Sequence, residues 1–438
     1  MRAMTEPPDA ASPNSPNSPE PARASAPPPT RAAFVFIFIT VALDMLALGV
    51  MIPVLPKLIV EFEHGNMADA AGAAGIFGFS WVAMQFAFSP LLGAISDRHG
   101  RRPVILLSNL GLGLDYLLMA LAPSLSWLFV GRLVSGITSA SFSTAGAYIA
   151  DVTPADERAA KFGMLGAAFG LGFVVGPALG GVLGGISLRL PFWAAAGLSL
   201  TNALYGFFIL PESLPTAQRA PFTWKKANPF GSLALLRSHP RLLGLALVAF
   251  LYNVAHDSLP SVFVLYTDYR YHWSERMVGL CLAGVGVAST LVSALLVGPL
   301  VKRLGERRAL LIGLVFGVAG FALYGWAPTG TWFLMGIPLM AIWGLAGPAF
   351  QSLMSRRVEP SAQGGLQGAL ASMSGITGMI GPLLFTQIFA FGISSKSLHL
   401  PGAPYWLAAA LLGASLLVAF VVAQDPEATP GEPKASAS

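Results

Sequence analysis

The feature that most constrains this chain is a succession of apolar runs, each long enough to cross a lipid bilayer as an α-helix, which needs about 20 residues for a hydrocarbon core of about 30 Å. The runs are continuously apolar, whereas the strands of a membrane barrel alternate over about ten residues. Only 11% of the residues are charged, against about 25% in soluble domains. The sequence therefore predicts an all-α membrane protein with twelve transmembrane helices. These predicted helices cover approximately 32–56, 70–92, 103–123, 126–150, 162–185, 190–211, 242–266, 277–300, 309–327, 331–354, 370–393 and 403–423.

The positions of Lys and Arg predict the orientation of the chain. Most of the 26 Lys and Arg fall in segments that are cytoplasmic if both termini are inside, as the positive-inside rule requires. The net charge of +5 then reflects topology and indicates no nucleic-acid partner. The Pro-, Ser- and Ala-rich ends have no apolar core, so we expect disorder there and expect the first helix to be the targeting signal. The predicted units are a tail at 1–30, a bundle at 31–211, a cytoplasmic linker at 212–241, a second bundle at 242–423 and a tail at 424–438.

An internal repeat indicates how the predicted helices are grouped. The stretch "GAISDRHGRR" at 93–102 matches "GPLVKRLGERR" at 298–308, and the matched residues are 205 positions apart. The same offset relates two further places in the two halves. The matched positions are Gly93 and Gly298, Arg98 and Arg303, Gly100 and Gly305, Arg102 and Arg307, Gly163 and Gly368, and Gly176-Pro177 and Gly381-Pro382. We therefore predict two six-helix halves of parallel-repeat type, with a substrate cavity between them.

A few ionisable residues lie inside the predicted helices, where a charge costs several kcal/mol unless it is paired or hydrated. They are Asp44, Asp115, Arg132, His256 and Asp257. A proton-coupled carrier needs a carboxylate that can be protonated in a low-dielectric site and can release the proton on rehydration. We favour this role for Asp44, as a cavity carboxylate, and consider it for Asp115 and Asp257; the alternative is polar packing between helices. Arg132 either neutralises one of these acids or extends toward the outer face, and His256 alone is more typical of a packing residue.

Amides and aromatic side chains are candidates for the lining of the cavity. Asn253, His256 and Asp257 share one helix face through their i, i+3 and i+4 spacing. The further cavity candidates are Gln85, Gln351, Gln387 and Trp343. Acids, amides and aromatics with little positive charge suit an amphipathic neutral or cationic compound. The sequence contains no GxxxxGK[ST] phosphate loop and no HExxH motif, so we expect an ion gradient as the energy source, and no enzyme activity, metal or cofactor.

Several motifs resemble a known family. The stretches "GAISDRHGRRP", "GRLVSG" and "LGFVVGPALGG" resemble the signature loop, the fourth-helix motif and the antiporter-type fifth-helix motif of the major facilitator superfamily. The stretches "LDMLALGVMIPVLPKLI", "GLDY" and "YHWSERMVGLCLAG" resemble its tetracycline-efflux branch. The resemblance implies a monomeric, proton-coupled antiporter of the bacterial inner membrane that exports an amphipathic drug-like compound by alternating access. A symporter or facilitator for a small metabolite is the alternative on the same fold.

The loop between the second and third predicted helices carries the gating candidates. They are Gly93, Asp97, Arg98, Gly100, Arg101, Arg102 and Asp151. We expect the two glycines to allow a tight reversal, and Asp97 to accept hydrogen bonds from a helix N-terminus, which the resemblance implies is that of the eleventh helix. The resemblance also implies an ion pair between Arg101 and Asp151, and a latch that holds the outward-open state. In the second half Lys302 replaces the acid, so we expect this latch on one side only.

The fifth predicted helix carries Gly172, Gly176, Gly180 and Gly184 on one face, beside Pro177. This face permits close helix packing and bending, either as generic packing or in the antiporter-specific role that the resemblance implies.

The sequence also departs from the pattern of the tetracycline exporters, which usually carry a titratable His in the eighth helix and an Asp in the ninth. Ser289 and Gly317 stand at these positions, which leaves the exported compound open between tetracycline and another amphipathic molecule.

Overall fold

The computed structural model describes residues 31–139, 141–154, 157–223, 228, 240–359, 362–396 and 399–423. This part of the chain is almost entirely helical and contains no strand. Twelve of its helical segments are long and apolar enough to cross a membrane, which confirms the predicted all-α fold class with twelve spans. The predicted tails at 1–30 and 424–438, and part of the predicted linker at 212–241, lie outside the described residues.

The first half of the chain forms six spans, two of which consist of two consecutive helices. The first span is broken between α1 and α2 because Pro53 and Pro56 lack the N–H that an uninterrupted helix needs. The fourth span contains α5 and α6. The helices are α1 (Arg31–Met51), α2 (Leu55–Phe62), α3 (Met67–His99), α4 (Arg101–Leu121), α5 (Leu125–Thr138), α6 (Ser141–Val152), α7 (Arg158–Gly184) and α8 (Leu190–Ile209).

The second half also forms six spans, and three of them are interrupted. One interruption is the π-helical turn η3 (Ser293–Val297) inside the eighth span, where an extra residue per turn is inserted into the α-helix. A short 3-10 turn, η1 (Thr216–Gln218), precedes this half. The helices are α10 (Pro240–His256), α11 (Ser258–Tyr271), α12 (Glu275–Val292), α13 (Gly298–Leu304), α14 (Glu306–Trp326), α15 (Gly330–Met335), α16 (Ile337–Trp343), α17 (Ala346–Ser355), α18 (Gln363–Ser394) and α19 (Ala403–Val422).

A single glycine separates the second span from the third in each half. Gly100 lies between α3 and α4 with a φ of 109°, and Gly305 lies between α13 and α14 with a φ of 79°. Glycine adopts this left-handed region without the steric cost that a Cβ imposes. Gly93 was also expected to shape this turn, but that expectation is wrong because α3 continues through Gly93 to His99.

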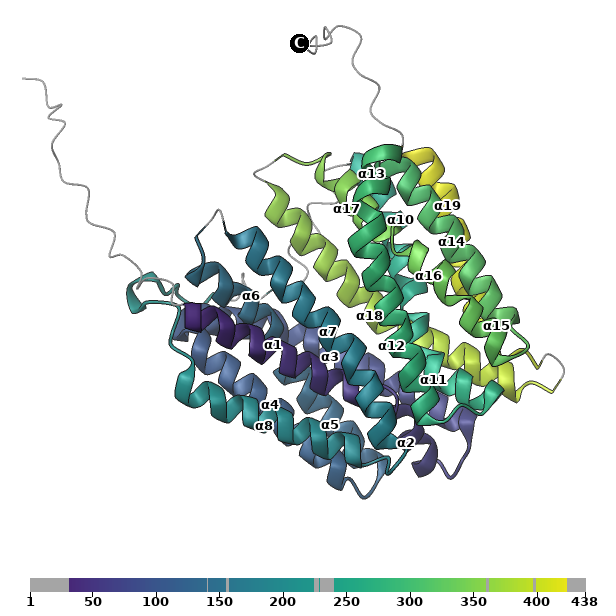
Figure 1. Ribbon diagram of the computed structural model, residues 1–438, viewed down its shortest axis with the longest axis horizontal. Coiled ribbons are helices and arrows are strands. Elements are labelled where there is room, and N and C mark those ends of the chain that lie inside the picture. The colour runs from purple at the N-terminus through teal and green to yellow at the C-terminus, as the bar shows by residue number, and fades with distance from the viewer. Residues whose placement is uncertain are drawn as a thin grey trace, which may run out of the picture.

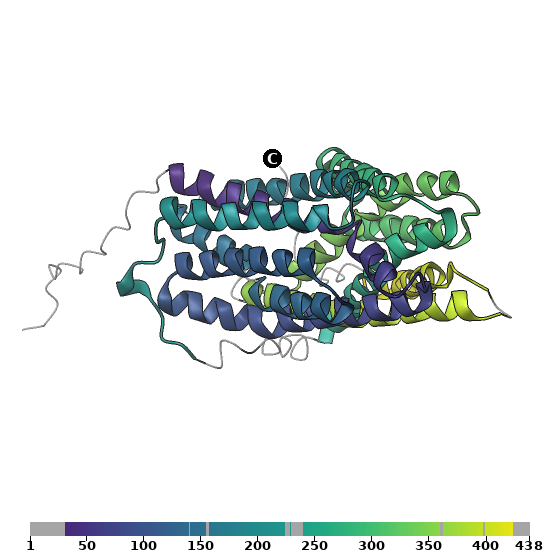
Figure 2. The same cartoon turned by 90° about the horizontal axis from the view of Figure 1, so that it is seen from below.

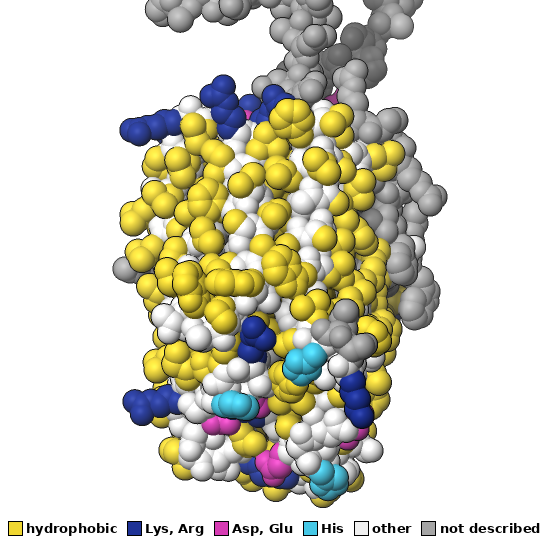
Figure 3. All heavy atoms as spheres, turned by 90° about the vertical axis from the view of Figure 1, so that its right-hand side faces the viewer, with side chains coloured by type: hydrophobic (Ala, Val, Ile, Leu, Met, Phe, Trp, Pro, Cys, Tyr) yellow, Lys and Arg dark blue, Asp and Glu magenta, His cyan; other side chains and the backbone are white. Residues whose placement is uncertain are grey.

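The two halves form separate bundles that lie side by side (Figures 1 and 2). They meet along two seams, in which α7 packs against α12 and α3 packs against α18. One outer face carries a broad band of hydrophobic side chains, with charged side chains gathered at its two ends (Figure 3). Large apolar side chains such as Phe208 and Leu417 are about three-quarters exposed, at 75% and 73%. This band is what a lipid-facing surface requires.

The buried interior differs between the halves. The second half has one continuous core that is rich in aromatic side chains. The first half has two apolar clusters. Buried polar side chains of α1, α4 and α8 form a layer near the boundary between these two clusters. The members of this layer are Thr40, Asp44, Ser108, Asn109, Ser199 and Asn202.

The two bundles are in close contact at one end and diverge at the other. We call the end that contains Lys57 the Lys57 end, and the end that contains the Gly100 turn the Arg101 end. Toward the Lys57 end, a Cβ on Gly279 of α12 would lie 2.9 Å from the Cα of Gly181 in α7, and a Cβ on Gly78 would lie 2.7 Å from the Cβ of Pro382. Toward the Arg101 end, a Cβ on Gly166 or on Gly364 would have no heavy atom within 4 Å. The interface between the bundles therefore opens toward the Arg101 end.

Candidate functional site

The charged residues among the predicted site residues occupy three regions of the molecule. Asp44, Asp115 and Arg132 are buried inside the first bundle. His256 and Asp257 lie at the junction of α10 and α11, in the middle of the seventh span. The residues of the signature loop lie at the Arg101 end.

Asp44 belongs to the buried polar layer of the first bundle. Its side chain is only 5% exposed. The Nδ2 group of Asn202 in α8 donates to Asp44 Oδ1 at 3.1 Å and to the backbone carbonyl of Thr40 at 3.2 Å. The expectation of a cavity carboxylate is therefore wrong, because the Asp44 side chain points into the bundle toward α8. Its proton-coupling role stays a prediction.

Asp115 and Arg132 form a second buried polar site, between α4 and α5. Asp115 is 1% exposed, and neither of its carboxylate oxygens has a hydrogen-bond partner among the described residues. Gly131 leaves space for it, because a Cβ there would lie 2.7 Å from Asp115 Oδ1. Arg132 interacts electrostatically with Asp115, but the described residues show no ion pair between them.

The guanidinium group of Arg132 is held by neighbouring helices. It lies 4.9 Å from the ring centroid of Trp81 in α3, and its Nη1 is 3.7 Å from the sulfur of Met51 in α1. The indole N–H of Trp81 donates to Ser135 Oγ at 3.2 Å. This position connects one cation to three other helices, α1, α3 and α4.

The junction of α10 and α11 places His256 and Asp257 at the seam. His256 ends α10, and Ser258 begins α11. The His256 ring lies 5.6 Å from the Trp343 ring, and its Nδ1 is 4.0 Å from Asp257 Oδ1. A Cβ on Gly381 of α18 would lie 3.1 Å from Asp257 Cγ, so Asp257 packs directly against the α18 backbone. One turn earlier in α10, Asn253 donates to Ser374 Oγ at 3.4 Å.

His256 faces the interface between the bundles and not the lipid. Its side chain is 53% exposed although it lies in the middle of a span. The lipid-facing side of α10 is marked by Leu247, which is 47% exposed. His256 follows nine residues later, about two and a half turns, and so lies on the opposite side of the helix. The exposed His256 surface therefore belongs to the opening between the helices.

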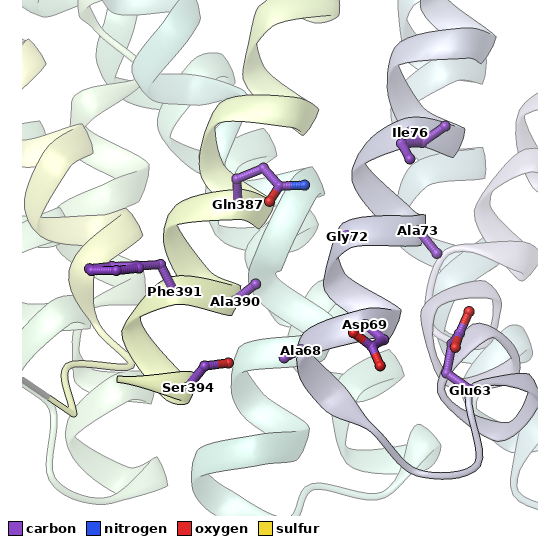
Figure 4. A pocket seen from close by; sticks show the side chains of 10 residues that line it. All are labelled: Glu63, Ala68, Asp69, Gly72, Ala73, Ile76, Gln387, Ala390, Phe391 and Ser394. Carbon is purple, nitrogen blue, oxygen red and sulfur yellow. The ribbon is translucent and has the colours of Figure 1, made fainter. Parts of the chain in front are cut away.

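The three glutamines predicted for the cavity do not lie together. Gln351 of α17 donates to Gln367 of α18 at 3.1 Å, toward the Arg101 end. Gln85 of α3 is partly buried. Gln387 lies toward the Lys57 end, in a pocket of about 660 Å³ between α3 and α18 that Glu63 and Asp69 also line (Figure 4). The prediction that Gln351 and Gln387 line one cavity is therefore wrong, because Gln351 contacts the Arg101 end of α18 and Gln387 lies toward its Lys57 end.

The signature loop at the Arg101 end is a network of charged and polar contacts. Arg101 Nε lies 3.0 Å from Asp151 Oδ2, which is the contact that the resemblance implies, and Arg101 Nη1 lies 2.5 Å from Asp97 Oδ1. Asp97 thus binds Arg101 and not the N-terminus of α18. Arg102 donates to the carbonyl of Phe207 at 2.7 Å, and Arg98 is exposed.

The segment that follows α8 completes this network, and the sequence analysis did not identify it. Glu212 Oε1 accepts from the backbone N–H of Arg101 at 2.8 Å and from that of Leu214 at 3.1 Å. Ser213 Oγ donates to Asp151 Oδ2 at 3.1 Å. The sequence signal for this contact was an acid followed by a hydroxyl residue directly after the sixth apolar run. These two residues connect the start of the linker to the Gly100 turn.

The second half contains an equivalent ion pair with the charges exchanged. Glu306 Oε1 lies 2.5 Å from Arg356 Nη2 and accepts from Ser352 Oγ at 3.2 Å. Glu306 and Arg356 follow Arg101 and Asp151 by the repeat offset of 205 residues. The sequence analysis did not anticipate this ion pair; the predicted latch on one side only, based on Lys302 at the Asp97 position, stays a prediction.

At the opposite end, Lys57 connects the two halves. Its ammonium group lies 3.1 Å from Glu275 Oε1 and 3.4 Å from Asp268 Oδ1, and donates to the backbone carbonyl of Trp273 at 2.7 Å. The Lys57 side chain is only 10% exposed. Among the described residues, these are the ion pairs that join one bundle to the other.

The glycine face of the fifth span packs inside the first half. A Cβ on Gly172 would lie 2.9 Å from the carbonyl carbon of Met45, and one on Gly176 would lie 2.7 Å from the Cα of Gly49. Gly180, one turn further along, contacts the Val50 backbone, and Pro177 Cδ lies 3.0 Å from a Cβ placed on Gly49. This stripe therefore fixes α7 on α1, while the neighbouring Gly181 faces α12 and Gly184 lies against both Val54 and Glu275.

Comparison with known proteins decides the family. The family model described as the Major Facilitator Superfamily matches residues 37–382 and, in a second match, 245–438. The chain belongs to the Major Facilitator Superfamily. Its described part is accordingly that of a multi-pass membrane protein with twelve spans.

Curated relatives within this superfamily include tetracycline resistance proteins. The class C protein of Escherichia coli is 39% identical over 363 residues, which cover 83% of this chain and 91% of that protein. The class D protein of Salmonella ordonez is 37% identical over 395 residues, which cover 90% of this chain and 97% of that protein.

Solved structures of the superfamily share the fold. The human organic anion transporter MFSD10 is 25% identical, with a TM-score of 0.65 over 90% of this chain and 100% of that chain. A bacterial homologue of the human lysosomal transporter Spinster, in an inward-facing and occupied conformation, has a TM-score of 0.73 over 91% of this chain and 98% of that chain, at 17% identity.

Within the superfamily fold, the two positions that depart from the tetracycline exporters lie in different surroundings. Ser289 is exposed on α12. Gly317 of α14 is covered by Trp343, because a Cβ there would lie 2.9 Å from Trp343 Cγ and 2.7 Å from Leu412 Cδ1. Trp343 is only 4% exposed and packs against the His256 ring. The prediction that Trp343 lines the cavity is therefore wrong.

Proposed function

We propose that this protein is a proton-coupled antiporter that exports an amphipathic drug-like compound, tetracycline or a similar molecule, by alternating access. The relatives named tetracycline resistance proteins, which match over most of their length, support drug export. We place the protein in the bacterial inner membrane as a monomer with the basic Arg101 end in the cytoplasm, by the positive-inside rule. The bundles diverge toward that end, so this conformation would accept the compound from the cytoplasmic side.

The observation that carries the proton coupling is the buried pair of Asp115 and Arg132. A buried cation and a buried anion that form no direct hydrogen bond with each other are costly, since their surroundings compensate neither charge fully. A proton on Asp115 removes the anion and leaves Arg132 without its counter-charge. Because Arg132 also contacts Trp81 and Met51, protonation would change the relative stability of two arrangements of α1, α3, α4 and α5. A proton can shift such an equilibrium only if the two arrangements differ in proton affinity.

Transport in everted membrane vesicles tests this function. An acidic vesicle interior should drive accumulation of labelled tetracycline, or of another compound from a panel of amphipathic drugs, and a protonophore should abolish it. Asp115→Asn removes the titratable group and should lower the initial rate by at least about tenfold. This corresponds to an activation free energy that is higher by roughly 1.4 kcal/mol. Glu157→Gln, at an exposed acid before α7, is the matched control and should transport normally.

Two results would contradict the proposal. Accumulation that persists with protonophore and in Asp115→Asn would show that export does not use protons at this site. Accumulation driven by an alkaline interior instead would assign the chain to the alternative class of symporters, which carry a metabolite together with the proton.

A further inference from the structure

Asp257 differs from Asp44 and Asp115 because the described residues show neither an amide donor nor a buried guanidinium beside its carboxylate. Asp44 receives the amide of Asn202, and Asp115 interacts with Arg132. Among the described residues, the group of opposite charge type nearest to Asp257 is the His256 imidazole at 4.0 Å, and Asp257 Oδ2 accepts no hydrogen bond. A carboxylate at this depth costs several kcal/mol unless a counter-charge is supplied.

The position of Asp257 allows a ligand to supply that charge. Its side chain is 20% exposed, and it packs on Gly381, next to Pro382, which contacts α3 of the first half. The bundles are close at this level and remain in contact as far as Phe86 and Gly375, where a Cβ on the glycine would lie 2.9 Å from Phe86 Cε2; beyond that contact they diverge toward the Arg101 end. Asp257 therefore lies near the narrow end of the opening between the bundles, close to both halves.

The neighbours of Asp257 provide an aromatic, partly polar surface. The exposed His256 ring lies over Trp343, and Trp343 in turn packs against Tyr252 at 4.9 Å between ring centroids. The absence of a side chain at Gly317 makes room for Trp343. The amide of Asn253 lies one turn away toward the open end. A planar, apolar molecule can stack on the imidazole while a positive group reaches the carboxylate.

We infer that Asp257 binds the positively charged group of the transported compound, and that the His256 ring and the Asn253 amide contact its planar body. The chemical class is an amphipathic organic cation with an aromatic or other flat ring system. The inference rests on the proposed function, since it assigns the substrate subsite of the exporter. The carboxylate and the cation neutralise each other in the low-dielectric interior, which is where such a pair gains most.

Equilibrium binding to the full-length protein in lipid nanodiscs tests this subsite without any gradient. The probes are ethidium and other permanently charged planar cations, each paired with an uncharged planar compound of similar size. Asp257→Asn should weaken cation binding by at least about tenfold, or roughly 1.4 kcal/mol, and leave the neutral compounds unchanged. Asp257→Glu should keep binding within about threefold because it keeps the charge. Glu157→Gln is the control, and thermal unfolding of each variant verifies that the protein is folded.

Two results would overturn the inference, and a third would separate it from the proposed function. If wild-type protein binds no member of the panel more tightly than its neutral partner, the site does not select cations. If Asp257→Asn binds the cations as well as wild type but loses proton movement, Asp257 is a proton site and not a substrate site. If Asp257→Asn loses cation binding while proton antiport fails even in wild type, the subsite stands and the proposed coupling is wrong.

Discussion

At the scale of single residues, three acids inside the spans are stabilised in three different ways. Asp44 accepts from Asn202, Asp115 lies near Arg132 without contacting it, and Asp257 has neither partner and reaches the opening between the bundles. The first arrangement, with a neutral amide donor on Asp44 Oδ1, is typical of polar packing between helices, and a proton-coupling role for Asp44 stays a prediction. The other two leave a charge incompletely compensated, which is typical of functional sites.

Removal of the Asn202 amide should destabilise the first bundle. Asn202→Ala removes the amide donor from Asp44 Oδ1, and a buried acceptor that loses its hydrogen bond costs about 1–3 kcal/mol. We expect a lower thermal unfolding temperature in detergent. Asn253→Ala is the matched control, because its bond to Ser374 is long, at 3.4 Å, and should cost less than about 0.5 kcal/mol. Equal unfolding temperatures for both variants would contradict this account of Asp44.

At the scale of helices, closure of the Lys57 end depends on charge and on close backbone contact. Lys57 of α2 binds Asp268 of α11 and Glu275 of α12, and the small residues Gly181 and Gly279 let α7 and α12 approach beside it. The sequence gives no local indication that Lys57 forms these contacts. Its partners follow more than 200 residues later, and a local sequence pattern cannot predict a contact across that separation.

Lys57→Met should favour opening at this end. The substitution keeps the apolar stem and removes the charge that both carboxylates share. Since Asp268 and Glu275 are 26% and 21% exposed, we expect a modest effect of about 1 kcal/mol, or roughly fivefold in the population that is open at the Lys57 end.

Spin-label distances in nanodiscs measure this shift. Labels at the exposed positions Glu61 and His272 report on the two bundles at the Lys57 end, and the longer distance should gain population in Lys57→Met. Lys302→Met, an exposed lysine at the Arg101 end, serves as the control. If both variants show the wild-type distribution, the ion pairs do not hold this end closed.

The rotation of each helix about its axis was the part of the site that sequence could not predict. The spans follow from hydrophobicity, and the twelve predicted ones are present. A helix such as α1 is apolar on all sides, however, so nothing in the pattern says which way Asp44 points. His256 and Asp257 were predicted to share a helix face with Asn253, and Asn253 and Asp257 do both contact α18.

At the scale of the whole molecule, the repeat explains both the symmetry and its departures. Gly100 and Gly305 make the same one-residue turn, and the ion pairs of Arg101 with Asp151 and of Glu306 with Arg356 stand in equivalent places with opposite charges. The glycines could be predicted because the same residue type recurs at the repeat offset. The exchanged charges were missed because a reversed ion pair preserves the interaction but not the residue type.

In an antiporter the compound and the proton move in opposite directions, so the sign of one pH change distinguishes antiport from symport. Purified protein is reconstituted into liposomes that are loaded with an exported compound, the membrane potential is clamped, and the internal pH is recorded as the compound leaves. An antiporter must bring protons in, so we predict an acidification above that of protein-free liposomes, which Asp115→Asn should abolish. An interior that becomes alkaline, or a compound that leaves with no change in pH, would contradict the account.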